Sequence, residues 1–212
     1  MPGPIRFFFW FRAVNAPMPE TPISSEAFAQ AVERIARQRG PVVVKLGGSA
    51  MEDPAATDAC LRSVVTLHRL GVPLVLVHGG GKPIDRAMAE AGLVPRKVAG
   101  RRYTDEATLK IVVKVLKAIG DDLAANLTEL GCPARRVSDA LLGKTLKLKH
   151  EDGLRIDLGA VGTVAKYRAP KAGFLPVIPS IARDRDEKWL NVNADTAASA
   201  VAGAIGAEKA IF

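Results

Sequence analysis

The sequence predicts an α/β protein of three layers, in which helices cover both faces of a central, mostly parallel open sheet. Continuous aliphatic runs at residues 41–46 and 72–78 suit strands that are covered on both faces, as in parallel sheets. Helical patterns separate and follow these runs, so that strand and helix alternate along the chain. Together, the buried runs and their alternation with helices favour this fold class over an all-helical or all-β one.

The remaining elements follow from periodicity and stop signals. Apolar residues recur at helical spacing over residues 53–71 and 104–131, and a glycine ends each segment. Residues 132–165 are expected to hold short strands joined by turns. The later elements are a buried strand, a helix of small residues and the start of a strand, over 174–182, 194–207 and 208–212.

Two segments precede the first buried strand. Residues 1–23 are interpreted as a disordered leader, and their apolar run FFFWF is too short for the centre of a secretory signal. Residues 24–40 are interpreted as an N-terminal helix, because Phe28, Val32 and Ile35 recur at helical spacing.

Composition excludes several classes of protein. The 212 residues are 48% hydrophobic, enough for a sizeable core, but no run approaches the ~18 residues of a membrane helix. The two cysteines lie far apart, which argues against a disulfide framework or zinc site and suits a reducing cytoplasm. The net charge of +8 comes without interleaved aromatics or a nucleic-acid motif, so a small anionic substrate is favoured over nucleic acid.

Glycines follow both early strands, as Gly47-Gly48 and as Gly79-Gly80-Gly81. Neither set matches the Walker or the dinucleotide fingerprint, because Pro83 and Ile84 stand where those motifs need other residues. The carboxyl ends of parallel strands are nevertheless where open α/β sheets bind ligands. Backbone N–H groups without side chains over them could cradle a phosphate or a carboxylate there.

Lys45 lies within the first buried strand. Burying its ammonium group would be costly without an anionic partner. The alternative is a lysine at the strand end whose side chain extends to water.

The motifs in this order resemble the amino acid kinase family over about residues 41–212. The HGGG motif alone is weak, but with G-x-R-x-T-D and N-V-N-A-D it forms a set that aspartokinases, carbamate kinases and uridylate kinases do not carry. The segments are VVVKLGGSAM, LVLVHGGGKPID, GRRYTDEATL, IDLGAVGTV, FLPVIPSIA and WLNVNADTAASAVAGAIGAEKAIF.

The resemblance implies transfer of the γ-phosphoryl group of ATP, with Mg²⁺, to the γ-carboxylate of N-acetyl-L-glutamate in arginine biosynthesis. It further implies a cytoplasmic homo-oligomer, a dimer or a hexamer, with no metal site built by the protein. Three alternatives stay open: a sister kinase for an N-blocked aminoadipate or for aspartate, a non-catalytic acyl-amino-acid-binding module, and a nucleic-acid binder.

The resemblance also implies roles for individual residues. Lys45 would stabilise the transferring phosphoryl group, and Asp195 would orient the catalytic lysines. Arg102 would pair with the substrate's α-carboxylate, since its planar fork matches a carboxylate. Glycine amides and asparagines would complete the site, with Gly47 and Gly48 on the phosphoryl group and Gly80, Gly81, Asn191 and Asn193 on the acylated amino acid.

Some of these positions have ordinary alternatives. Arg101 could take the role given to Arg102. Asn191 and Asn193 could simply cap the next helix, with Asp195 as an acid favoured in its first turn. His78 is expected to be structural, because a carboxylate acceptor is already ionised at pH 7 and needs no general base.

The chain departs from the family pattern in three places. It ends before the L-T-D loop and the second catalytic lysine, so 41–190 is interpreted as the acyl-amino-acid domain and 191–212 as the start of a nucleotide-binding domain. Such a chain is expected to bind substrate weakly and turn over little.

Only AKYRAPKAG separates the strand at 161–164 from that at 174–182, which predicts an unusually short βαβ crossover. The leader before Met18 matches nothing in the family.

Overall fold

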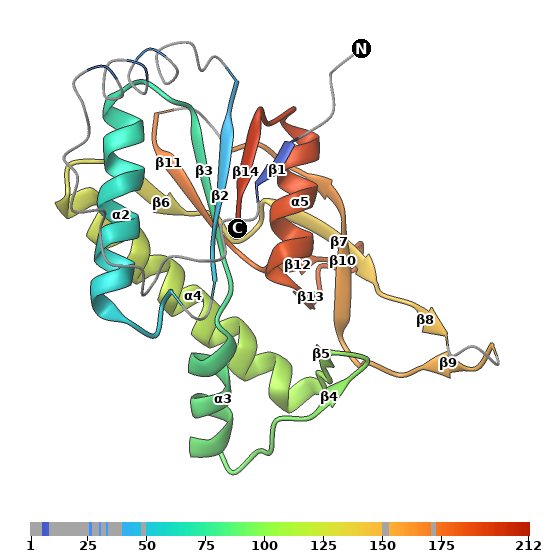
Figure 1. Ribbon diagram of the computed structural model, residues 1–212. Coiled ribbons are helices and arrows are strands. Elements are labelled where there is room, and N and C mark those ends of the chain that lie inside the picture. Colours follow the sequence, from blue (N-terminus) through green and yellow to red (C-terminus); the bar gives the residue numbers. More distant parts are fainter. Residues whose placement is uncertain are drawn as a thin grey trace.

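The computed structural model describes residues 6–8, 26, 30, 33, 40–47, 50–149, 153–170 and 173–212. Its centre is a six-stranded sheet in which every neighbouring pair is parallel, as predicted (Figure 1). In spatial order the strands are β1 (Arg6–Phe8), β14 (Lys209–Ile211), β2 (Val42–Leu46), β3 (Leu74–His78), β11 (Leu175–Pro179) and β6 (Ala134–Arg136).

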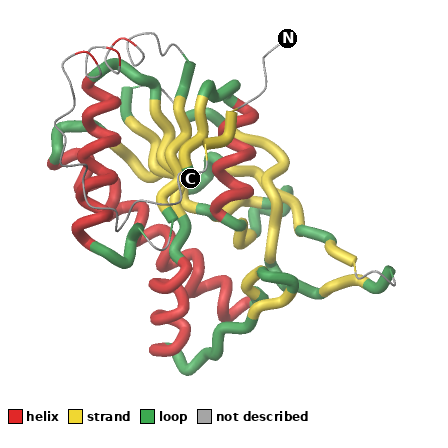
Figure 2. The backbone as a smooth tube through the Cα atoms, in the orientation of Figure 1, coloured by secondary structure: helices red, strands yellow, loops and turns green. Residues whose placement is uncertain are grey.

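Helices cover both faces of this sheet, so the predicted three layers are confirmed. Helices α2 (Pro54–Arg69) and α4 (Glu106–Glu129) lie on one face, and α5 (Ala194–Ala204) lies on the other. Figure 2 shows the sheet between these helices, with α3 (Gly81–Glu90) extending beyond its lower end.

The side-chain alternation of the strands sorts the core into two clusters. On β2, Val42 packs with α2 and α4, whereas Val43 packs with α5. On β3, Leu76 belongs to the first cluster and Val77 to the second. Lys45 is two residues after Val43, so its side chain leaves the strand on the face covered by α5.

Side-chain caps define where three of the helices begin. Asp53 accepts a hydrogen bond from Ala55 N at 2.9 Å at the start of α2, and Asp105 accepts one from Thr108 N at 2.8 Å at the start of α4. Asn193 does the same for α5. These short polar residues satisfy backbone N–H groups that have no partner within the helix.

A second, smaller sheet stands beside the first and closes into a barrel. Its strands are β10 (Val161–Tyr167), β13 (Trp189–Val192), β12 (Ile181–Arg183) and β7 (Leu141–Thr145). The crossover predicted between 161–164 and 174–182 is therefore wrong. Strand β10 runs antiparallel to β7 in the barrel and β11 belongs to the central sheet, so the connection changes sheets and needs no helix.

Two ribbons complete the described residues. Strands β4 (Lys97–Val98) and β5 (Arg101–Arg102) form a hairpin near α3, and β8 (Leu148–Lys149) pairs with β9 (Arg155–Ile156) in an arm away from the body (Figure 1). Among the described residues, the helices are all too short or too polar to cross a bilayer.

The N-terminal segment differs from expectation at residues 6–8, which were interpreted as part of a disordered leader. They form β1 and pair in parallel with β14. Only positions 26, 30 and 33 of the helix predicted over 24–40 are described, all helical, and the rest of that segment before Gly40 lies outside the described residues.

Candidate active site

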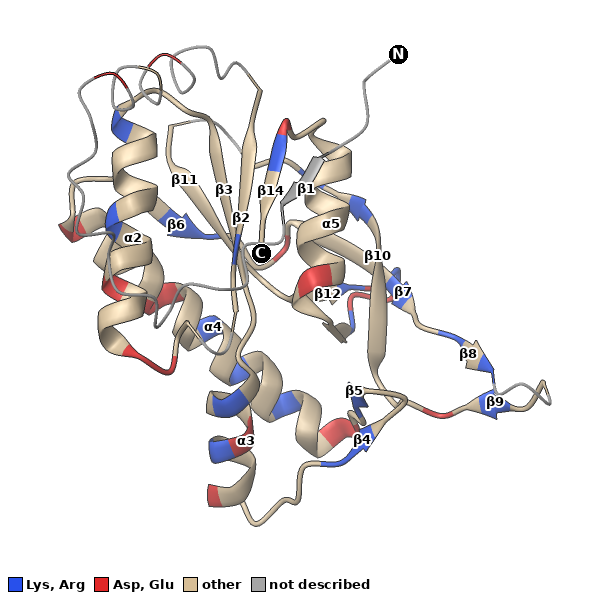
Figure 3. Ribbon diagram, viewed as in Figure 1, with Lys and Arg blue, Asp and Glu red and all other residues tan. Residues whose placement is uncertain are grey.

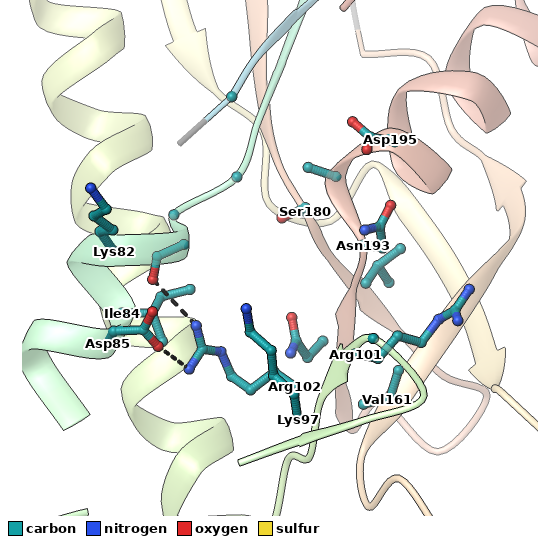
Figure 4. A pocket seen from close by; sticks show the side chains of 18 of the residues that line it. Lys82, Ile84, Asp85, Lys97, Arg101, Arg102, Val161, Ser180, Asn193 and Asp195 are labelled. Atoms are coloured by element: carbon teal, nitrogen blue, oxygen red, sulfur yellow. Dashed lines mark hydrogen bonds and ion pairs between the residues drawn. The ribbon is translucent and has the colours of Figure 1, made fainter. Parts of the chain in front are cut away.

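A cavity of about 400 Å³ opens where β2, β3 and β11 end. Its walls come from the first residues of α3 and α5, from the β4–β5 hairpin and from β13 (Figure 4). All the predicted site residues that the structure describes line this cavity; Gly48 lies outside the described residues.

We call one wall the lysine side, formed by Lys45, Gly47 and Asp195. Lys45 Nζ lies 2.9 Å from Asp195 Oδ1, so the lysine has an anionic partner although only 18% of its side chain is exposed. A Cβ at position 47 would lie 2.8 Å from Lys45 Nζ. The absence of a side chain at Gly47 therefore leaves the space through which the ammonium group enters the cavity.

The start of α5 settles how the two asparagines are used. Asn193 Oδ1 accepts from Thr196 N at 3.0 Å, so Asn193 caps the helix; it also lines the cavity, and its contact with the acylated amino acid stays a prediction. Asn191 does not cap the helix; its Nδ2 donates to Thr104 Oγ1 at 3.0 Å. Asp195 stands in the first turn, where the helix dipole favours an acid, and it also holds Lys45.

The glycine triplet joins β3 to α3. Gly80 is the N-cap residue and Gly81 the first helical residue, and no acid stands in the first turn of α3. A Cβ on Gly80 would lie 2.9 Å from Leu116 Cδ2, whereas one on Gly81 would meet nothing within 4 Å. Gly80 is thus needed for close packing on α4, and Gly81 leaves the helix N-terminus open to an anion.

The opposite wall consists of Asp85, Arg102 and Asn191. We call these three residues, together with the buried Thr104 behind them, the arginine side. Arg102 Nη1 donates to Asp85 Oδ1 at 2.5 Å, and its Nη2 donates to Gly81 O at 3.2 Å. These contacts hold the guanidinium group against α3 with 12% of the side chain exposed. An arginine carries five N–H donors, so some remain for a ligand.

Arg101 also lines the cavity, but its side chain points away from the Arg102 guanidinium group (Figure 4). Within the described part of the chain it has no ion-pair partner. The choice between the two arginines therefore stays a prediction for mutagenesis.

The cavity carries more positive than negative charge. Its three acids each face a base, in the pairs Lys45–Asp195, Lys82–Glu52 and Arg102–Asp85. Lys97 and Arg101 line it without an ion-pair partner among the described residues, and the ribbon in Figure 3 marks basic residues on α3, α4 and the β4–β5 hairpin. This surplus favours anionic ligands.

His78 ends β3 but does not line the cavity. It is fully buried, its Nδ1 lies 3.0 Å from Gly79 O, and its Nε2 has no partner in the described structure. Burial, helped by the charge of Arg136, lowers the pKa of His78 from 6.5 to about 4, against the opposing effect of the bond to Gly79. The imidazole is thus neutral at pH 7, with Nδ1–H donating to Gly79 O, which agrees with the structural role expected.

Several polar residues that line the cavity were not found from the sequence, among them Glu52, Lys82, Asp85 and Lys97, and the buried Thr104 behind the wall was also missed. Asp85 lies one turn after Gly81 on α3, and this helical spacing was a usable signal that it faces Arg102. Thr104 is joined to Asn191 across 87 positions of the chain, and no local pattern signals such a contact. Among the described residues no group of three His, Cys, Asp or Glu side chains could hold a metal ion.

Comparison with known proteins bears on the fold and on the family. The profile of the amino acid kinase family matches residues 40–212. Acetylglutamate kinases of Methanocaldococcus jannaschii, Methanothermobacter thermautotrophicus and Acinetobacter baylyi are 37%, 39% and 34% identical over 89%, 82% and 81% of this chain. The chain spans 68%, 65% and 61% of the lengths of these relatives, about two thirds of each.

Solved structures share the fold. N-acetylglutamate synthase from Neisseria gonorrhoeae, complexed with coenzyme A and N-acetyl-glutamate, matches 88% of this chain and 45% of its own, with a TM-score of 0.73 at 22% identity. Aspartate kinase from Synechocystis matches 81% of this chain and 28% of its own, with a TM-score of 0.53 at 18% identity. At these identities the likeness concerns the fold alone.

Proposed function

The chain belongs to the amino acid kinase family, and from this premise we propose that it serves the transfer of the γ-phosphoryl group of ATP to the γ-carboxylate of N-acetyl-L-glutamate. The product is an acyl phosphate, and the reaction belongs to arginine biosynthesis. The acetylglutamate kinases similar to this chain over most of its length support this substrate pair.

One observation carries the proposal: Lys45 Nζ is held 2.9 Å from Asp195 Oδ1 where two glycine-flanked strands end. Phosphoryl transfer leaves the protein little covalent work, so positioning and charge stabilisation dominate catalysis. A fixed ammonium group beside bare backbone N–H groups stabilises charge that develops on a transferring phosphoryl group. In this proposal Asp195 keeps the ammonium group in place, and Gly47 lets it enter the cavity.

The arginine side would hold the acceptor. A carboxylate acceptor and a polyphosphate repel each other, and the surplus of basic side chains around the cavity offsets that repulsion. Arg102, already oriented by Asp85, would bind the α-carboxylate with its remaining N–H groups, and Asn191 would contact the acylated amino group. Since the acceptor carboxylate is ionised at neutral pH, no side chain is assigned as a general base.

Mg²⁺ enters this proposal together with ATP. Magnesium usually keeps several waters and is bound through one or two carboxylates plus substrate phosphates, which suits a cavity whose acids are already paired with bases. When bound, it would neutralise charge on the phosphates. A cytoplasmic location and a homo-oligomeric assembly, dimer or hexamer, belong to the same proposal, and light scattering of the purified chain checks the assembly.

The test combines binding with turnover. Calorimetry should detect N-acetyl-L-glutamate binding to the 212-residue chain, and a hydroxamate assay with ATP and Mg²⁺ should detect the acyl phosphate. N-acetyl-2-aminoadipate and aspartate serve as competing acceptors. Binding of neither acylated amino acid would refute the proposal, and preference for aminoadipate or aspartate would reassign the substrate. Binding that ATP does not affect, with no turnover, would instead support the non-catalytic module.

A further inference from the structure

We propose that Thr104 is a positioning residue that fixes how Asn191 presents its side-chain amide to the acceptor. This inference rests on the proposed function for its ligand, but the contacts that carry it are independent of any ligand. Thr104 is fully buried and does not line the cavity, whereas its partner Asn191 does.

The hydrogen bonds of the Thr104 hydroxyl group determine which end of the Asn191 amide faces Thr104. Thr104 Oγ1 lies 2.9 Å from Arg102 O, and a carbonyl oxygen can only accept, so the hydroxyl hydrogen is used there. Toward Asn191 the same oxygen can then only accept. Asn191 must therefore turn Nδ2 to Thr104, at 3.0 Å, which leaves Oδ1 and the second N–H for a ligand.

The backbone around Thr104 keeps this hydroxyl in place. Thr104 N donates to Leu158 O at 3.1 Å, and Ala160 N donates to Thr104 O at 2.7 Å. A Cβ on Gly159 would lie 2.2 Å from Thr104 O, so only glycine allows this approach. Backbone hydrogen bonds and this close approach thus tie Thr104 to residues 158–160.

The same network joins the two residues assigned to the acceptor. Asn191 N donates to Ala160 O at 2.9 Å, so the backbone of β13 is tied to the segment that holds Thr104. Thr104 binds the carbonyl group of Arg102 at one end and the amide of Asn191 at the other. One buried hydroxyl thereby sets the amide orientation of Asn191 relative to the backbone of Arg102.

This arrangement suits an N-acylated amino acid. Its amide N–H needs an acceptor and its oxygens need donors, and the anchored Asn191 offers one of each. If the anchor is removed, the Asn191 amide can rotate, and part of the population presents the wrong group to the ligand. Ligand affinity falls accordingly, while the rest of the fold keeps its contacts.

The test uses Thr104→Val, which has a similar shape but no hydroxyl group, and Thr104→Ser, which restores the hydroxyl group. Thr104→Val should weaken N-acetyl-L-glutamate binding roughly 3- to 10-fold in calorimetry, the usual net worth of one hydrogen bond. Thr104→Ser should stay within about twofold of wild type. Thr108→Val is the matched control, because Thr108 is a buried threonine of α4 that does not line the cavity.

Two readouts separate positioning from general damage. In an Asn191→Ala background, Thr104→Val should weaken binding no further; an equal loss in both backgrounds would overturn the inference. Hydrogen exchange of the Asn191 side-chain amide, followed by NMR without ligand, should be faster in Thr104→Val than in wild type and Thr104→Ser. Equal exchange in all three would also overturn it, whereas failure of wild type to bind N-acetyl-L-glutamate would refute the proposed function instead.

Discussion

The two walls of the cavity are built in different ways. The lysine side combines the end of strand β2 with the start of helix α5, and one ion pair, Lys45–Asp195, connects them. The arginine side joins four segments, around residues 81–85, 102–104, 158–160 and 191, through hydrogen bonds between distant parts of the chain. A charged group can thus be positioned by the end of one strand or helix. Orienting a ligand instead requires hydrogen bonds between segments that are distant in the sequence and meet only in the folded chain.

Replacing Lys45 is the strongest way to test the lysine side. Lys45→Ala should reduce kcat by about 10²- to 10³-fold, the usual loss for one group that stabilises developing charge. Steady-state hydroxamate kinetics measure this effect in a chain that turns over. Lys110→Ala, at an exposed position of α4 paired with Glu106, is the control. An unchanged kcat in Lys45→Ala would remove Lys45 from the mechanism.

Acidification should affect stability through His78, the buried last residue of β3. The unfolded chain takes up a proton near pH 6.5, but the folded His78, with its pKa lowered to about 4, does not. The unfolded state therefore binds more protons between these values, and the free energy of unfolding falls as pH drops from about 6.5 to about 4, by up to about 3 kcal/mol.

Urea unfolding of wild type and His78→Gln at pH 7 and pH 4 isolates this contribution. Glutamine does not titrate, so the stability advantage of wild type over the variant should shrink at the lower pH. If the difference in unfolding free energy between wild type and His78→Gln is the same at pH 7 and pH 4, protonation of His78 does not cause the loss of stability.

Replacing Arg102 tests the arginine side. Arg102→Ala should weaken binding of N-acetyl-L-glutamate by roughly 1.5–3 kcal/mol, the range of charge-assisted hydrogen bonds, partly because Asp85 loses its partner. Isothermal calorimetry measures the change. Should Arg101→Ala weaken binding while Arg102→Ala does not, the assignment of the two arginines must be exchanged.

Two glycine substitutions distinguish activity from stability. Gly47→Ala would place a Cβ 2.8 Å from the mobile end of Lys45, so it should lower turnover, by roughly tenfold, and leave unfolding unchanged. Gly80→Ala would place a Cβ 2.9 Å from Leu116 Cδ2, and overpacking of this kind costs about 1–3 kcal/mol of stability. The opposite pattern in kinetics and urea unfolding would contradict these roles.

The sequence predicted most of the fold because the parallel strands are continuous aliphatic runs separated by well-marked helices. It placed Lys45 on a strand flanked by glycines, and that segment is β2, but periodicity alone did not show that Lys45 faces α5. It did not reveal that β10 belongs to a barrel, since a strand's partners are set by long-range pairing. Nor did it reveal β1, because pairing with β14 depends on an edge that exists only after folding.

The residues of the candidate site likewise fall into those with a local sequence signal and those whose contacts form only in the folded chain. Residues at a strand or helix end, such as Lys45, Gly80 and Asp195, carried local signals, and all three line the cavity. Thr104 carries no charge and is fully buried, and it contacts Asn191 only in the folded chain, so no sequence pattern predicted this contact. The roles of all these residues stay predictions until variants are measured.

The central claim is that the arginine side holds the acceptor and the lysine side acts on the phosphoryl group. Calorimetric titration of N-acetyl-L-glutamate into wild type, Lys45→Ala and Arg102→Ala tests it most directly. We expect Lys45→Ala to bind within about twofold of wild type and Arg102→Ala to bind at least about tenfold more weakly. Equal weakening in both variants, or none in Arg102→Ala, would contradict the division of labour between the two walls.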